Sequence, residues 1–103
     1  MKAVLDAGIR LHRIVSARRP AFWVTEFSWD SSPPDPEAIP VGLHARWTSE
    51  AMYRMWRSGV SLVTWFTLVD MQFPNLPYQS GLYFEGGKPK PVLTAFRLSL
   101  IHI

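Results

Sequence analysis

The chain has 103 residues, of which 48% are hydrophobic, including five tryptophans and six phenylalanines. This composition is rich enough to build a buried core and excludes an intrinsically disordered chain. The net charge is +3, but five of the eleven basic residues fall on or just after one amphipathic stretch within residues 2–19. We interpret them as the solvent-facing side of a helix and expect no nucleic-acid partner.

Several classes of site have no signal in the sequence. There is no cysteine, which excludes a disulfide framework and a thiolate metal site and leaves the redox compartment undecided. No apolar run approaches the length of a membrane span, and no spacing of His, Asp and Glu suggests a metal. We therefore expect no cofactor, no metal and no membrane partner.

The first elements along the chain alternate between helix and strand. Apolar residues recur at helical spacing over residues 1–17, and Pro20 ends that helix. Residues 21–27 have the pattern of a strand. The segment 30–36 contains three prolines in four residues, so we expect a stiff loop there.

A second helix and a second strand follow. The helix is expected over residues 41–58, with Gly59 as its C-terminal stop and with one apolar stripe formed by Ala45, Thr48, Met52, Met55 and Trp56. The strand is expected over residues 60–67, and a last short helix begins at Pro91. The order strand, helix, strand predicts two adjacent parallel strands joined by a crossover helix.

Three ordered motifs resemble the last quarter of retaining glycoside hydrolases built on a (β/α)8 barrel. They are Trp-Val-Thr-Glu-Phe-Ser-Trp at residues 23–29, Val-Thr-Trp-Phe at 63–66 and Gly-Lys-Pro-Lys-Pro at 87–91. The resemblance implies an α/β fold, a partial TIM barrel covering roughly the last two βα units. Such a barrel needs about 250 residues, so we interpret the chain as a fragment whose missing N-terminal barrel segments are its structural partner.

The resemblance covers residues 1–97. The remaining residues, 98–103, resemble the translation of a transposon-end adapter, and we interpret them as a non-native tail. A genuine apolar tail is the alternative.

Glu26 is the candidate catalytic residue. Strict alternation along the strand places Phe22, Val24 and Glu26 on one face, which we expect to line the barrel interior. The resemblance implies that Glu26 is the nucleophile of a retaining glycosidase. Retention requires a second carboxyl about 5–5.5 Å away, and we find no candidate for it in this chain. The alternative for Glu26 is a strand-end carboxylate paired with an arginine.

Four further residues are candidates for binding the carbohydrate substrate. Trp65 is expected on the same face as Val63, where its indole would reach the mouth of the barrel and carry a sugar ring. A core tryptophan is the alternative. Trp29, Asp70 and Tyr78 are expected on loops of the same end, either contacting sugar hydroxyls or simply exposed.

The sequence thus predicts a fragment of a retaining glycosidase that supplies the nucleophile but not the acid/base, and that is inactive by itself. Two alternatives stay open. One is a non-catalytic carbohydrate-binding relative of these barrels, and the other is a structural βαβ fragment with an ion-paired Glu26.

Overall fold

A computed structural model of the chain describes residues 21–101, and the helix expected over residues 1–17 lies outside this range. The elements in chain order are β1 (Trp23–Phe27), β2 (Ser31–Ser32), β3 (Ile39–Pro40), α2 (Val41–Arg57), β4 (Leu62–Trp65) and α3 (Pro91–Ile101). The expected strands, the crossover helix and the final helix are therefore present, each within a few residues of its predicted bounds.

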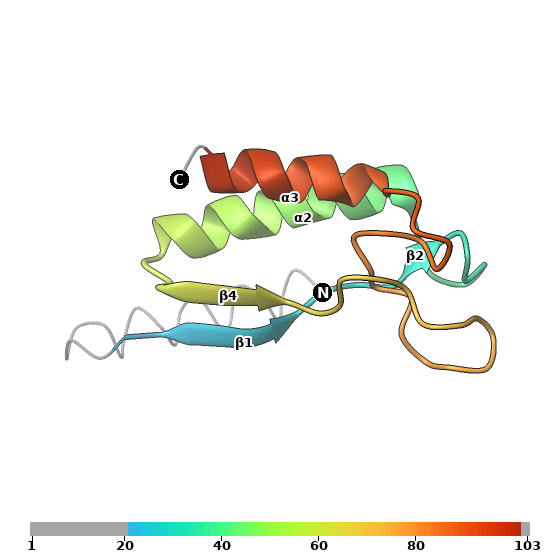
Figure 1. The fold of residues 1–103 in the computed structure, drawn as a ribbon. Helices are drawn as coiled ribbons and strands as arrows, with labels where there is room; N and C mark the ends of the chain where they lie inside the picture. Colours follow the sequence, from blue (N-terminus) through green and yellow to red (C-terminus); the bar gives the residue numbers. More distant parts are fainter. Residues whose placement is uncertain (1–20, 102–103) are drawn as a thin grey trace.

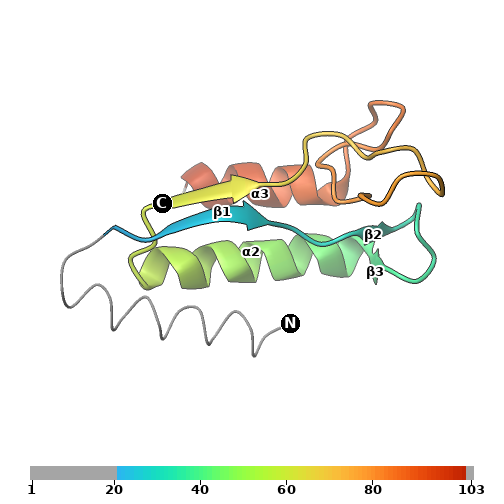
Figure 2. The ribbon, with the colours of Figure 1, turned by 90° about the horizontal axis from the view of Figure 1, so that it is seen from below.

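The central feature is a pair of parallel strands, β1 and β4. Trp23 pairs with Leu62, Val24 with Val63 and Phe27 with Trp65, so the carboxyl ends of both strands lie at the same end of the pair. Figures 1 and 2 show the two arrows side by side and pointing the same way. The predicted parallel arrangement, with Glu26 and Trp65 at one end, is confirmed.

Helix α2 begins directly after Pro40, which supplies no side-chain cap. Its last turn carries Arg54 and Arg57, cations that favour the negative end of the helix dipole. Arg54 also pairs with Glu50 one turn earlier, at 3.0 Å. Gly59 follows the helix with φ 83°, a left-handed conformation that glycine adopts without steric cost, and the chain turns there into β4.

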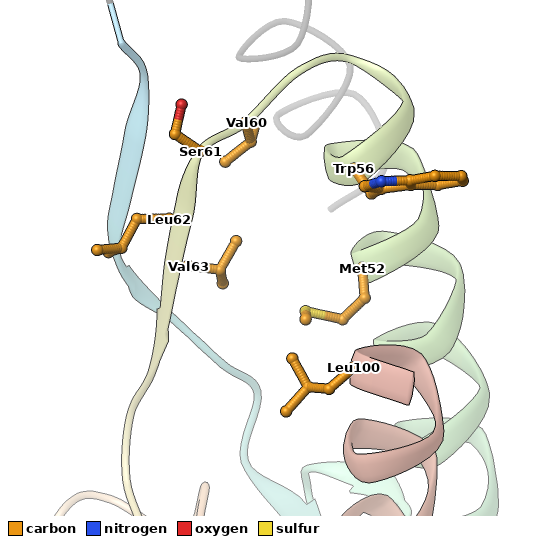
Figure 3. A pocket seen from close by; sticks show the side chains of 7 residues that line it. All are labelled: Met52, Trp56, Val60, Ser61, Leu62, Val63 and Leu100. Carbon is orange, nitrogen blue, oxygen red and sulfur yellow. The ribbon is translucent and has the colours of Figure 1, made fainter. Parts of the chain in front are cut away.

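Both helices cover one face of the strand pair (Figure 1). The buried centre consists of Ala51, Met52 and Met55 of α2, with half-buried apolar residues from both strands and from α3 packed against it. Val24 and Val63 belong to this packing, and Figure 3 shows Val63 pointing toward Met52. We expected Val24 and Val63 to lie on the strand face that lines the barrel interior. That expectation is wrong, because these two side chains face the helices.

The opposite face of the strand pair carries Trp23, Thr25, Glu26, Leu62 and Thr64, all exposed. We call it the open face. Leu62 points away from the helices in Figure 3, and 62% of the surface of Trp23 is exposed. No described element covers this face.

An irregular register gives Glu26 its place on the open face. Between its pairings at Val24 and Phe27, β1 uses one residue more than β4 does between Val63 and Trp65. Both Val24 and Phe27 pack on the helix side. Regular alternation would have put Glu26 on the side of Val24, but the extra residue leaves it exposed, as bulges often do near functional sites.

The remaining chain gathers at the carboxyl end of the strands. There, β2 pairs in parallel with β3, and the long segment between β4 and α3 folds over the same end (Figure 1). Helix α3 then runs beside α2 and in the same direction (Figure 1). It continues to Ile101 and so crosses the boundary after residue 97 that we predicted between the barrel segment and a non-native tail. Whether residues 98–103 are native stays a prediction.

Candidate functional site

Glu26 lies near the carboxyl end of β1, one residue before the Phe27–Trp65 pair. Its side chain is exposed, and within residues 21–101 it forms no hydrogen bond or ion pair. The arginine partner considered as an alternative is therefore absent from the described part of the chain. A carboxylate in this position is free to meet a ligand that approaches the open face.

Two of the predicted sugar-binding tryptophans lie on the helix side instead. The ring of Trp65 packs edge-on against Phe27, His44 and Phe96, with centroids 5.7, 5.8 and 6.0 Å away. Its indole N–H donates to the carbonyl of Ser80 at 2.9 Å. Trp65 is thus half-buried and packed against rings on the helix side, and it is not presented on the face of Glu26 as we expected.

Trp29 also differs from its predicted position on an exposed loop. Its ring packs edge-on against Phe27 at 4.9 Å and against Trp47 of α2 at 5.8 Å. It is half-buried and contributes to the packing around the α2 core. Trp29 lies two residues after Phe27, so alternation along the chain puts its ring on the same, helix-facing side.

Asp70 is the third predicted site residue whose position differs from the prediction. We expected it on a loop surface, but it is 5% exposed and its Oδ1 pairs with the ammonium of Lys90 at 2.6 Å. The same oxygen accepts the backbone N–H of Gly81 at 2.8 Å. A carboxylate held in this way is not available to a sugar or as a second catalytic acid.

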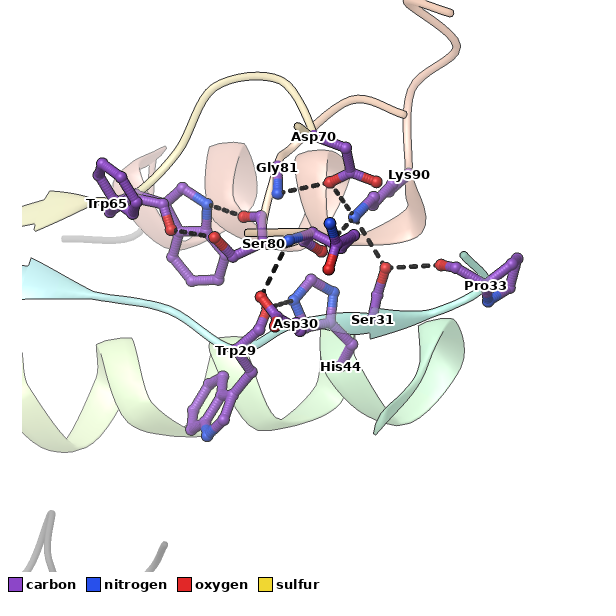
Figure 4. A network of polar contacts seen from close by, with 12 residues as sticks. Trp29, Asp30, Ser31, Pro33, His44, Trp65, Asp70, Ser80, Gly81 and Lys90 are labelled. Atoms are coloured by element: carbon purple, nitrogen blue, oxygen red, sulfur yellow. Dashed lines mark hydrogen bonds and ion pairs between the residues drawn. The ribbon is translucent and has the colours of Figure 1, made fainter. Parts of the chain in front are cut away.

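Lys90 is the centre of this buried group, which we call the polar cluster (Ser31, Asp70, Gln79 and Lys90; Figure 4). The Lys90 Nζ donates to Ser31 Oγ at 2.7 Å, Asp70 Oδ1 at 2.6 Å and the Gln79 carbonyl at 2.9 Å. Burial lowers the pKa of Lys90 below its ordinary value, and the hydrogen bond to Asp70 opposes this shift. All three ammonium protons thus have an acceptor in a buried site.

A close backbone approach shapes the cluster. A Cβ added at Gly81 would lie within 3.0 Å of Asp70 N, Tyr83 O and Val69 C. Only glycine lets these backbone segments meet so closely, and the meeting brings the Gly81 N–H to Asp70 Oδ1.

Two further titratable groups border the cluster. His44 of α2 is fully buried, and its Nε2 lies 2.8 Å from the Trp29 carbonyl, to which it donates. Burial lowers the pKa of His44, and this carbonyl bond opposes the shift. Burial likewise raises the pKa of Asp30, whose Oδ1 accepts the backbone N–H of Gln79 at 3.1 Å.

Tyr78 is the predicted sugar-binding residue that keeps an exposed loop position. It is 45% exposed, and its ring rests edge-on against Phe66 at 5.1 Å. Sequence reasoning missed Lys90 and His44 as organising residues. The Lys-Pro motif at 90–91 could have pointed to Lys90, and the helical spacing of His44, Thr48 and Met52 could have pointed to the buried side of α2.

A pocket of 190 Å³ lies at the other end of the strand pair (Figure 3). It is lined mainly by apolar side chains of α2, α3 and the beginning of β4, including Met52, Trp56 and Leu100. No charged residue lines it. Ser61 is the one polar side chain among its lining residues, and the pocket offers no carboxylate, histidine or lysine for acid or base chemistry.

Residues 21–101 contain no candidate for two other classes of site. No group of three His, Asp or Glu side chains in this range is arranged to hold a metal ion. Neither described helix is long and apolar enough to cross a membrane.

Comparisons with known proteins give a match to a solved structure. No protein-family model and no curated protein matches the chain. Among solved structures, it is similar to GH5_18 from Streptomyces cattleya, crystallised in complex with GlcNAc. The TM-score is 0.71 at 21% sequence identity, and the match covers 97% of this chain but 25% of that one. The chain thus has the fold of about a quarter of that protein.

Proposed function

We propose that the chain is part of a retaining glycoside hydrolase with a (β/α)8 barrel and that Glu26 is its nucleophile. The observation that carries the proposal is the position of Glu26, which is exposed near the carboxyl end of one of two parallel strands. Barrel enzymes build their active sites at this end. The likeness to a quarter of a GH5_18 structure with bound GlcNAc supports a carbohydrate substrate.

Two less exposed carboxylates near the strand ends, Asp70 and Asp30, support the assignment of Glu26 by contrast. Asp70 is neutralised by Lys90, and Asp30 is bonded to the backbone of Gln79. Neither is free to act as the acid/base that a retaining mechanism needs about 5–5.5 Å from the nucleophile. Within residues 21–101 we assign no carboxylate to this role, and we propose that the rest of the parent protein supplies it from the side of the open face.

In the proposed mechanism the Glu26 carboxylate attacks the anomeric carbon, and the bond to the leaving oxygen breaks as the external acid protonates it. Water, activated by the same group in its basic form, then releases the sugar from Glu26. Tyr78, an exposed aromatic residue at this end, is proposed to contact the sugar. Trp65 packs against Phe27, the residue after Glu26, on the helix side of the strands.

The test uses the full-length parent protein. Glu26→Gln should nearly abolish turnover and keep sugar binding, because the amide has the shape of the carboxylate without its nucleophilic charge. Glu26→Ala should regain turnover with added azide as an external nucleophile. Glu85→Gln, at another exposed glutamate, is the matched control and should behave as the parent.

The turnover and sugar-binding results together decide whether Glu26 is a nucleophile. Near-normal turnover in Glu26→Gln would remove the nucleophile assignment. Sugar binding without any turnover in the unmodified parent would instead identify a non-catalytic carbohydrate-binding relative.

A further inference from the structure

Lys90 joins segments that lie far apart in the sequence. Its three partners are Ser31 in β2, Asp70 after β4, and Gln79 further along the same loop. Lys90 is 2% exposed, so each of these bonds is formed without competition from solvent. Such bonds are directional, and together they fix the three segments relative to one another.

The cluster is connected to the ends of both main strands. The Gln79 carbonyl accepts the N–H of Ser31 at 3.1 Å, and the Gln79 N–H reaches Asp30, which follows β1. The next residue, Ser80, donates its hydroxyl to the Phe66 carbonyl at 2.7 Å, directly after β4. The segment around Gln79 is thus bonded to the chain leaving β1 on one side and to the chain leaving β4 on the other (Figure 4).

We propose that Lys90 is a positioning residue of the glycosidase site, which fixes the Tyr78 segment relative to the strand that carries Glu26. The inference rests on the proposed function. Tyr78 directly precedes Gln79, whose carbonyl Lys90 holds, and the Tyr78 carbonyl accepts the N–H of Met71 at 2.8 Å. Glu26 lies on the strand whose continuation contains Ser31, the second partner of Lys90. Lys90 itself touches no substrate.

Stability alone does not account for this arrangement. A buried ion pair is often replaced by apolar residues without loss of stability, whereas apolar residues form no directional bonds. The two roles of Lys90 therefore respond differently to substitution. Removing both charges should restore stability, but it should not restore the alignment of Tyr78 and Glu26.

The experiment compares three variants of the full-length parent: Lys90→Met, Lys90→Met combined with Asp70→Asn, and the control Lys88→Met at an exposed lysine nearby. The single variant leaves an unpaired buried carboxylate and should lose thermal stability. The double variant removes that charge, keeps an acceptor for the Gly81 N–H, and should regain most of the melting temperature. We expect kcat/KM to stay about 100-fold low in the double variant, the scale of a 1 Å misalignment.

A second readout is independent of catalysis. Hydrogen exchange in peptides covering residues 76–82 should be faster in the double variant than in the parent at equal melting temperature. Parental kcat/KM in the stable double variant, or unchanged exchange over residues 76–82, would overturn the positioning role. Glu26→Gln measured in the same series separates the two proposals, since full turnover there overturns the proposed function and leaves the exchange result to decide on Lys90.

Discussion

Glu26 on the open face and the polar cluster around Lys90 lie at the same end of the molecule, but they are completed in different ways. The cluster is closed within the chain, because every ammonium proton of Lys90 has a partner among the described residues. Glu26 has no partner among them, and the face around it is exposed. The cluster is therefore part of the framework, whereas the surroundings of Glu26 are completed from beyond the described residues.

The open face gives the largest expected effect. Residues 1–103 expressed alone should associate and show no glycosidase activity, because Trp23 and Leu62 are 62% and 40% exposed and, within residues 21–101, the outer edges of the strand pair are unpaired. Replacing both residues by threonine should shift the population toward smaller species in size-exclusion chromatography. Tyr53→Thr, at a tyrosine of α2 that is 53% exposed, should not. A monodisperse, cooperatively melting chain that cleaves a chromogenic glycoside would contradict this prediction.

Breaking the cluster gives the next effect, measured in the full-length parent. Lys90→Met should lower the free energy of unfolding by about 3–5 kcal/mol, since it leaves the buried Asp70 carboxylate unpaired. Lys88→Met, at an exposed lysine, should change it by less than about 0.5 kcal/mol. Urea denaturation of both variants measures the difference. Equal stability of the two would mean that solvent reaches Asp70.

The close approach at Gly81 is expected to contribute less. Gly81→Ala should cost about 1–3 kcal/mol, the usual range for overpacking, because the added methyl group meets backbone atoms of Asp70, Tyr83 and Val69. Gly86→Ala is the matched control, since a Cβ there has open space around it. The same denaturation experiment compares them. Equal free energies of unfolding for Gly81→Ala and the control would mean that the backbone segments around Gly81 move apart without cost.

The smallest effect concerns His44 and pH. Its pKa is lowered from 6.5 by burial, so the unfolded chain takes up the proton first as the pH falls. The stability that neutral His44 contributes is complete above about pH 6.5, and it declines below that value until the folded protein is protonated as well. His44→Gln keeps a donor for the Trp29 carbonyl but does not titrate, so its stability should fall less between pH 7.5 and 5.5. The raised pKa of Asp30 is common to both proteins and cancels in the comparison.

Much of the local structure was predictable from the sequence. The glycine at the C-terminal stop of α2 and the strand-helix-strand order follow from backbone chemistry and hydrophobic periodicity. These signals act within a few residues, so they predicted the bounds of α2 and the parallel pairing of β1 with β4. They also predicted that Glu26 and Trp65 lie at the same end of the pair.

The faces of the strands were predicted less well. Alternation from Phe22 to Glu26 assumed a regular strand, but the register of β1 slips between Val24 and Phe27. Such a slip depends on how the strand packs against α2 and pairs with β4, neither of which is visible in the local sequence. As a result Glu26 does not share the helix-facing side of Val24.

The sequence by itself determined which residue types were present and in what order the elements follow, including a glutamate near the end of a strand. Only the tertiary structure decided that Asp70 is buried and paired while Glu26 is exposed. The physical reason is that an ion pair such as Lys90–Asp70 joins residues 20 positions apart, and Lys90 also reaches Ser31, 59 positions away. Whether a carboxylate is neutralised or free depends on such distant partners, which the folded backbone brings together.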